Sequence, residues 1–214
     1  MKFDNEKILI LSAHTDDMEV SCAGTVSRIM RDTNRECKMF SVAFSPALES
    51  LPKGFSQDST NIEFKESMLF QGITNSLLYK YEVRKFPSFR QEILENIVEI
   101  RKQFLPTIIF THSRFDIHQD HQTIYEETVR AFKGRDVTIL GYELLENCLS
   151  FNSNFFIEIE KEDLEKKINS FKIYKSQIVK GKNLNSVVES LAVVRGSQIR
   201  KEYAECFDCI KMKI

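Results

Sequence analysis

Short apolar runs that alternate with longer amphipathic stretches constrain the fold of this chain most strongly. Three such runs are rich in Ile, Leu, Val and Phe: Lys7 to Ala13, Lys38 to Phe44 and Thr107 to Thr111. Unbroken runs of this length are typical of strands that are covered on both faces. Because helix-like stretches separate the runs, the pattern predicts an α/β fold with a mostly parallel sheet flanked by helices.

The other predicted elements follow from hydrophobic spacing and from turn residues. We predict helices over 19–31, 60–70, 88–104, 119–132, 162–174, 186–194 and 198–212, and further strands over 77–81, 137–142 and 155–159. Pro106 ends the helix with the clearest apolar stripe, and Gly72 suits the C-terminal cap of another. No stretch has the composition of a linker, so we expect one catalytic domain over residues 1–214.

Composition narrows the class of protein. Hydrophobic residues make up 42% of the 214 residues and charged residues 29%, which is ordinary for a globular protein that buries a core. The net charge of −1 offers no electrostatic basis for binding nucleic acid. The five scattered cysteines indicate reduced thiols. The apolar run at 8–11 is too short for a signal peptide or a membrane span, so we expect a cytoplasmic protein.

All four histidines lie in or beside two carboxylate-rich clusters. His14 begins the sequence His-Thr-Asp-Asp, directly after the first apolar run. His118 and His121 enclose a Gln-Asp pair, and His112 follows the run at 107–111. Ligands of open α/β sheets bind just outside the carboxyl ends of the strands. We therefore expect both clusters to contribute to one site.

Imidazole and carboxylate groups together suit a divalent metal ion. Zn²⁺ and Fe²⁺ both bind such a set, and a catalytic zinc site takes three protein ligands and one water. The first cluster offers His14 and either Asp16 or Asp17, and the second offers one of its histidines. The remaining aspartate can take a proton from metal-bound water, and Asp120 can orient a neighbouring histidine. An aspartate at a strand–helix junction is also a common helix N-cap, so spacing alone leaves that alternative open.

At these residues the sequence resembles the PIG-L/LmbE-like family of zinc-dependent de-N-acetylases. Residues 8–25, ILILSAHTDDMEVSCAGT, are similar to the family's first motif, a strand followed by His-Pro-Asp-Asp. Residues 116–124, DIHQDHQTI, are similar to its second motif, His-x-Asp-His. Weaker similarity extends over 84–113 and 195–207. The resemblance implies a Rossmann-like, LmbE-like fold and hydrolysis of an N-acetyl group, usually on an amino sugar.

The resemblance also implies a role for each motif residue. Zinc would have three protein ligands: His14, Asp17 and His121. Asp16 would be the general base for zinc-bound water. His118 would stabilise the oxyanion or protonate the departing amine, with Asp120 holding it. The chain departs from the family at Thr15, where proline is usual, and near Glu63, where a substrate-contacting arginine is common.

Residues outside the two motifs give weaker signals. Arg84 and Arg195 are candidate substrate-binding residues. The guanidinium group of Arg84 can bind a phosphate or a carboxylate, but an arginine at this position is also compatible with a solvent-exposed surface. His112 either lines the pocket or is a structural histidine. Cys206 and Cys209 form a CxxC motif without the second pair that a structural zinc site needs. We expect these two thiols on one face of the helix predicted at 198–212.

Alternatives from other classes remain at this point. Another metallohydrolase, such as a phosphoesterase, more often needs a second metal ion. A non-catalytic relative would bind the sugar without turning it over. No GxGxxG follows the first strand, which disfavours a nucleotide-binding domain. We therefore predict an N-acetylated sugar or glycoconjugate precursor as the partner, with no nucleic acid and no transmembrane segment, in a chain compatible with a homo-oligomer.

Overall fold

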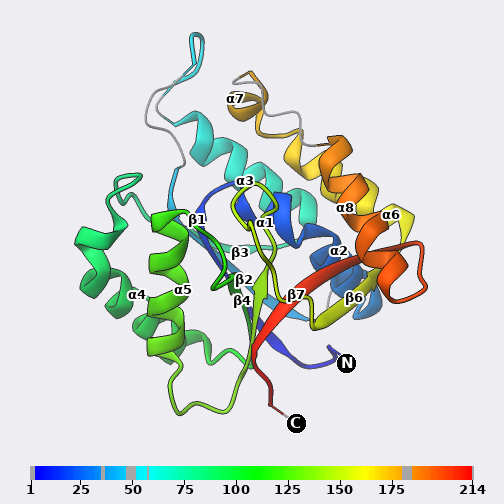
Figure 1. Ribbon diagram of the computed structural model, residues 1–214. Coiled ribbons are helices and arrows are strands. Elements are labelled where there is room, and N and C mark those ends of the chain that lie inside the picture. Colours follow the sequence, from blue (N-terminus) through cyan, green and yellow to red (C-terminus); the bar gives the residue numbers. More distant parts are fainter. Residues whose placement is uncertain (1–2, 35–36, 47–51, 57, 180–184, 214) are drawn as a thin grey trace.

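The computed structural model describes residues 3–34, 37–46, 52–56, 58–179 and 185–213. Within these residues, seven strands form one sheet in the order β3-β2-β1-β4-β5-β7-β6 (Figure 1). The strands are β1 (Lys7–His14), β2 (Lys38–Ser45), β3 (Asn75–Leu78), β4 (Ile108–His112), β5 (Thr138–Tyr142), β6 (Phe155–Ile159) and β7 (Tyr203–Lys211). The helices are α1 (Asp17–Ser21), α2 (Ala23–Asp32), α3 (Ser59–Gln71), the 3-10 turn η1 (Phe86–Phe89), α4 (Arg90–Phe104), α5 (Gln119–Ala131), α6 (Lys161–Phe171), α7 (Lys175–Ile178) and α8 (Asn185–Gln198).

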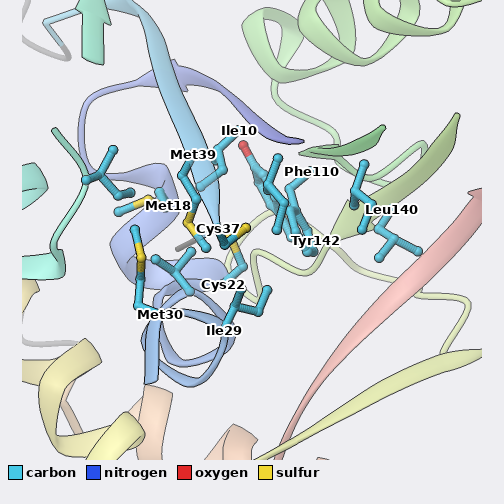
Figure 2. Close-up of a cluster of buried hydrophobic side chains, with 14 of the residues drawn as sticks. Ile10, Met18, Cys22, Ile29, Met30, Cys37, Met39, Phe110, Leu140 and Tyr142 are labelled. Atoms are coloured by element: carbon cyan, nitrogen blue, oxygen red, sulfur yellow. The ribbon is translucent and has the colours of Figure 1, made fainter. Parts of the chain in front are cut away.

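The sheet is mostly parallel and is covered on both faces. Strands β1 to β5 pair in parallel, and only β7 runs against its neighbours β5 and β6. Alternate residues of β1 enter different cores: Ile8 and Ile10 pack with α2 and α3, whereas Leu9 and Leu11 pack with α4 and α5. Figure 2 shows part of the first core, in which Ile10 lies near Met39. The predicted α/β class is confirmed, and burial on both faces explains the unbroken apolar runs.

The strand order predicts where on the sheet a ligand should bind. β2 and β3 lie on one side of β1, and β4 and β5 lie on the other, so the strand order reverses between β1 and β4. Open α/β sheets bind ligands at this reversal, outside the carboxyl ends of the strands. β1 ends at His14 and β4 ends at His112, so the topology brings both histidines to that point.

The helix predicted at 19–31 is instead two helices, α1 and α2, which meet at Cys22. Glu205 of β7 accepts hydrogen bonds from the backbone N–H groups of Gly24, at 3.1 Å, and Thr25, at 2.6 Å. These are first-turn N–H groups of α2, which have no partner within their own helix. A Cβ at Gly24 would lie 2.9 Å from the Glu205 carboxylate, so this glycine permits a close approach.

The helix predicted at 198–212 is wrong, because most of that segment is strand β7. Two of its charged residues are buried and paired with distant partners. The Glu205 carboxylate lies 2.5 Å from Nζ of Lys167, and Asp208 accepts a hydrogen bond from Nε of Arg114 at 2.7 Å. A strand with buried charges lacks the apolar–polar alternation that identifies strands, which is why its sequence did not predict one.

The CxxC pair therefore lies on a strand rather than on one helical face. Side chains three residues apart on a strand point to opposite faces of the sheet. Cys206 is buried, whereas Cys209 is half-buried and packs against the core shown in Figure 2. The expectation that the two thiols share a face is wrong.

Smaller differences concern element ends. Gly72 has φ of 91° and caps α3, as predicted. The strand predicted at 77–81 is β3, which begins earlier and ends at Leu78, although Tyr79 and Tyr81 still donate hydrogen bonds to β2 carbonyls. Among the described residues, no helix has the length and the apolar character needed to cross a membrane.

Candidate metal centre

Three elements, β1, α1 and α5, position the side chains of the candidate centre. β1 ends at His14, and the following turn places Asp16 as the N-cap of α1 and Asp17 as its first residue. His118 is the N-cap of α5, where its Nδ1 accepts a hydrogen bond from the Asp120 backbone N–H at 3.2 Å. His121 lies one turn further along α5. The two sequence clusters therefore form one site, as their positions after β1 and β4 indicated.

The donor atoms of the three predicted metal ligands lie close to one another. His14 Nδ1 lies 3.8 Å from Asp17 Oδ1 and 3.1 Å from His121 Nε2. His121 Nε2 lies 3.7 Å from Asp17 Oδ1. Ligands about 2.0–2.2 Å from a tetrahedral zinc ion are roughly 3.4 Å apart, so this triangle has the dimensions that a metal ion requires. The other carboxylate oxygen of Asp17 accepts the His14 backbone N–H at 2.7 Å, which fixes the turn.

Two further combinations of donors lie close enough to share an ion. Within the described residues, His14, His118 and His121 form one group whose donor atoms are within 4.8 Å of each other, and Asp17, His112 and His121 form another. His121 belongs to both groups and to the triangle above. His118 is half-buried and its ring stacks on His121 with 4.4 Å between centroids, so it lies on the open side of the cluster.

Aspartates contact the outer nitrogens of the two histidines that are candidate ligands. Asp116 Oδ2 lies 2.7 Å from His121 Nδ1, and Asp120 Oδ2 lies 3.2 Å from His14 Nε2. Carboxylates in these positions orient metal-binding imidazoles and select their tautomer. Asp116 is the first residue of the second motif, but neither residue spacing nor the family resemblance implied a role for it. Its signal was its place in the motif DIHQDH, five residues before His121.

Asp120 serves a different histidine from the one expected. Its side chain contacts His14, and it reaches His118 only through its backbone N–H. The carboxylate also accepts the backbone N–H groups of Arg84, at 2.7 Å, and Phe86, at 3.3 Å. These contacts with the segment before α4 draw the side chain toward β1 and away from His118. The expectation that the Asp120 side chain holds His118 is corrected accordingly.

His112 lies beneath the cluster and is fully buried. Its Nε2 is 3.2 Å from Asp17 Oδ2 and accepts the Ala13 backbone N–H at 2.9 Å. Its ring stacks on His121 with centroids 4.0 Å apart and meets the edge of Tyr142. His112 therefore supports the cluster from inside the protein and has no open surface toward a pocket.

Protonation in the cluster is controlled by burial and by the aspartates. Burial opposes the charged form of His14, but hydrogen bonds to Asp120 and Asp17 outweigh it and raise its pKa from 6.5 to about 10. Burial, together with the charge of His112, lowers the pKa of His121 to about 4. Burial disfavours ionised Asp17, yet the neighbouring histidines hold its pKa well below the usual value. Ionised carboxylates thus surround the imidazoles and favour a positive charge at the centre.

The other predicted site residues lie at varying distances from the cluster. Asp16 is buried beside Asp17, and its charge acts on His14. Arg84 is exposed, and its backbone contacts the Asp120 carboxylate. Arg195 instead forms a two-pronged ion pair with Glu143, at 2.9 and 2.5 Å, so protein acceptors hold its guanidinium.

Glu63 stands near the position where the resemblance led us to look for an arginine. It is buried, and its carboxylate accepts hydrogen bonds from the Ser176 backbone N–H at 3.0 Å and hydroxyl at 2.5 Å. It therefore anchors the first turn of α7 to α3. The departure from the family pattern has a structural explanation in this contact.

Solved structures with the same fold come from enzymes of more than one reaction class. N,N'-diacetylchitobiose deacetylase from Pyrococcus horikoshii has a TM-score of 0.78 and 18% identity, over 97% of this chain and 84% of that chain. The 4-carboxy-2-hydroxymuconate hydratase GalB from Pseudomonas putida has a TM-score of 0.76 and 16% identity, over 98% of both chains. A teicoplanin deacetylase in a zinc-inhibited form has a TM-score of 0.73 and 13% identity, over 93% of this chain and 96% of that chain. At these identities the likeness shows a shared fold.

Sequence comparison gives the family. No curated protein matches the chain in sequence. The family model PIG-L, described as GlcNAc-PI de-N-acetylase, matches residues 9–132, which is more than half of the chain and includes both histidine clusters. The chain therefore belongs to the PIG-L family of de-N-acetylases.

Proposed function

We propose that this protein is a metal-dependent hydrolase that removes an N-acetyl group from an amino sugar or a sugar conjugate, acting as a single catalytic domain. The observation that carries the proposal is the triangle of His14, Asp17 and His121, whose donor atoms lie 3.1 to 3.8 Å apart. Two aspartates hold its histidines through their outer nitrogens, as carboxylates behind metal-binding histidines do. Membership of a de-N-acetylase family supports the reaction class.

The donor set fits Zn²⁺ and equally Fe²⁺, since two imidazoles and one carboxylate suit both ions. Such an ion would supply Lewis acidity that lowers the pKa of water toward ~7. Asp16 lies beside the ligand Asp17 and is buried, so its carboxylate is positioned to take a proton from the attacking water.

His118 faces the open side of the cluster and completes the reaction. The water oxygen bonds to the amide carbon, and negative charge develops on the carbonyl oxygen, to which the imidazole donates a hydrogen bond. The C–N bond then breaks, the proton that Asp16 took from the water passes to the nitrogen, and the free amine leaves with acetic acid, which ionises to acetate. Burial, followed by the charge of His14, lowers the pKa of His118, which keeps its resting form neutral at pH 7.

The test is acetate release from a panel of N-acetylated sugars by protein loaded with Zn²⁺ or Fe²⁺. We expect Asp16→Asn to reduce kcat by at least about a hundredfold, which is the usual contribution of a general base. Asp136→Asn, which removes an exposed carboxylate, is the matched control. An Asp16→Asn variant that stays as active as the control would refute the base role.

The same assay separates other reaction classes. Absence of acetate from every sugar would remove the deacetylase proposal, and one hydratase already shares the fold. Two metal ions per chain together with phosphate ester cleavage would instead favour a phosphoesterase. Tight sugar binding without turnover would identify a non-catalytic relative.

A further inference from the structure

The four histidines of the candidate metal centre have two kinds of partner, and the two candidate ligands contact carboxylates. Asp120 Oδ2 lies 3.2 Å from Nε2 of His14. Asp116 Oδ2 lies 2.7 Å from Nδ1 of His121. In each neutral ring the proton lies on the nitrogen that faces the carboxylate, so the other nitrogen carries a lone pair. These two lone-pair nitrogens, Nδ1 of His14 and Nε2 of His121, lie 3.1 Å apart and can share a metal ion.

The other two histidines are held by backbone N–H groups. Nδ1 of His118 accepts the Asp120 backbone N–H at 3.2 Å. Nε2 of His112 accepts the Ala13 backbone N–H at 2.9 Å. Because a backbone N–H can only donate, the ring nitrogen that it contacts must supply a lone pair and carries no proton. In the neutral ring the proton therefore lies on the opposite nitrogen, which is Nε2 in His118.

The start of α5 holds the His118 ring in this state. His118 is the N-cap residue, with φ of −74° and ψ of 124°, and the N–H that it accepts belongs to the first turn, where N–H groups have no partner within the helix. Asp116 Oδ1 accepts the His118 backbone N–H at 2.8 Å, which fixes the residue on its N-terminal side. Moving the ring proton to Nδ1 would leave the Asp120 N–H without this acceptor, which costs free energy.

His118 nevertheless lies within reach of the candidate ligands. One of its ring nitrogens is within 4.8 Å of donor atoms of His14 and His121, and its ring centroid is 5.1 Å from that of His14. Together with Asp17, these residues would provide four protein ligands, as in structural zinc sites, whereas a catalytic site keeps one position open for water. Neither nitrogen of His118 can bind a metal ion in the observed arrangement, because one accepts an N–H and the other carries the proton.

We propose that the Asp120 backbone N–H selects the Nε2–H form of His118 and thereby keeps this histidine from becoming a fourth protein ligand of the metal ion. The inference rests on the proposed function, because it concerns the centre that would perform the hydrolysis. The main chain of Asp120 is then a positioning group that acts through His118. The proton on Nε2 that prevents ligation is also the one that the imidazole donates to the carbonyl oxygen of the amide.

The first test observes the ring directly by long-range ¹H–¹⁵N NMR of the histidine side chains in ¹⁵N-labelled, zinc-loaded protein. Such spectra distinguish a ring protonated at Nε2 from one protonated at Nδ1, and the signals of His118 are those that disappear in His118→Gln. We expect His118 to carry its proton on Nε2. A wild-type His118 ring that is protonated at Nδ1, or bound to zinc through Nε2, would overturn the proposal.

Two substitutions at position 120 isolate the contribution of the N–H. Proline has no N–H and is tolerated in the first turn of a helix, so Asp120→Pro removes both the carboxylate and the donor. Asp120→Ala removes only the carboxylate and is the matched control. We expect Asp120→Pro to bind Zn²⁺ roughly tenfold more tightly than Asp120→Ala, which is the order of one hydrogen bond that no longer opposes ligation by His118. Adding His118→Gln should remove this gain in the proline variant and leave the zinc affinity of the alanine variant unchanged.

Co²⁺ in place of Zn²⁺ reports whether a coordination position is open. Azide should change the absorption spectrum of Co²⁺-loaded Asp120→Ala and leave that of Asp120→Pro unchanged, because four protein ligands would fill the second site. Equal zinc affinities and the same response to azide in two folded variants would overturn the proposal, and the NMR measurement on the wild type needs neither variant. Protein that shows the expected ring proton but releases no acetate from any sugar would support this inference and refute the deacetylase function.

Discussion

Asp116 should control how tightly the centre binds its metal ion. Its Oδ2 lies 2.7 Å from His121 Nδ1, and its Oδ1 accepts the His118 backbone N–H at 2.8 Å. In Asp116→Asn, the amide oxygen keeps the contact with the His118 N–H, so its NH₂ group faces His121 Nδ1. That nitrogen must then accept a hydrogen bond, which moves the imidazole proton to Nε2, the atom that faces the metal.

The size of the effect follows from this change of tautomer. Loss of a carboxylate behind a metal-binding histidine lowers metal affinity by roughly 10- to 100-fold, which corresponds to about 1.4–2.8 kcal/mol. Asp116 is 1% exposed, so water cannot readily replace the carboxylate, and we expect a result near the upper end of that range.

The assay is competition for Zn²⁺ between metal-free protein and a chromogenic chelator. Asp163→Asn is the matched control. It also removes a buried carboxylate, but one that lies outside the cluster and binds Ser27 and Arg31. Thermal unfolding followed by circular dichroism checks that both variants fold. A folded Asp116→Asn protein with wild-type zinc affinity would contradict the proposed bracing of His121.

Three further predictions concern the framework around the centre, each measured as the free energy of unfolding in urea. Tyr174→Phe removes the hydroxyl that donates to the Thr15 carbonyl at 2.7 Å, and the buried carbonyl left behind should lower stability by about 1–3 kcal/mol; no change would mean that the turn finds another donor. Gly24→Ala places a methyl group 2.9 Å from the Glu205 carboxylate and should cost about 1–3 kcal/mol, whereas wild-type stability would show that the start of α2 can shift. Lys167→Met leaves Glu205 without its cation and should cost about 3–5 kcal/mol, more than Lys167→Met combined with Glu205→Gln; an equal loss in both variants would exclude an unpaired buried charge as the cause.

The strands that were predicted correctly are those whose structure is determined by one local pattern in the sequence. β6, Phe155–Ile159, has the predicted bounds, and the apolar runs before His14 and His112 became parallel strands. Because parallel strands end at the same edge of a sheet, placing the two clusters together required only the strand assignment. The proximity of histidines about 100 residues apart was therefore predictable without knowledge of any distance.

The parts that failed depend on partners distant in sequence. β7 reads as a helix because its buried Glu205 and Asp208 are neutralised by Lys167 and Arg114, which no local pattern reveals. The break between α1 and α2 has the same origin, since the Glu205 carboxylate takes over the first N–H groups of α2. In both cases a contact between residues distant in sequence overrides local preference.

The residues that hydrogen-bond to the histidines of the centre were also difficult to predict from the sequence. The resemblance assigned the Asp120 carboxylate to His118, yet the side chain contacts His14, 106 residues away. Similarly, His112 packs against Asp17 across the β1–β4 junction. Residue spacing identifies which groups meet at a sheet edge, but side-chain direction and packing determine which pairs form.

These cross-contacts show that the two motifs depend on each other's side chains. The second motif supplies Asp120, which orients His14 of the first, and the end of β4 supplies His112, which contacts Asp17 of the first. The first motif in turn places His14 Nδ1 against Nε2 of His121. The first segment therefore cannot set the tautomer of His14 by itself, because a His-Asp-Asp turn without the second motif would lack the Asp120 carboxylate that holds its histidine.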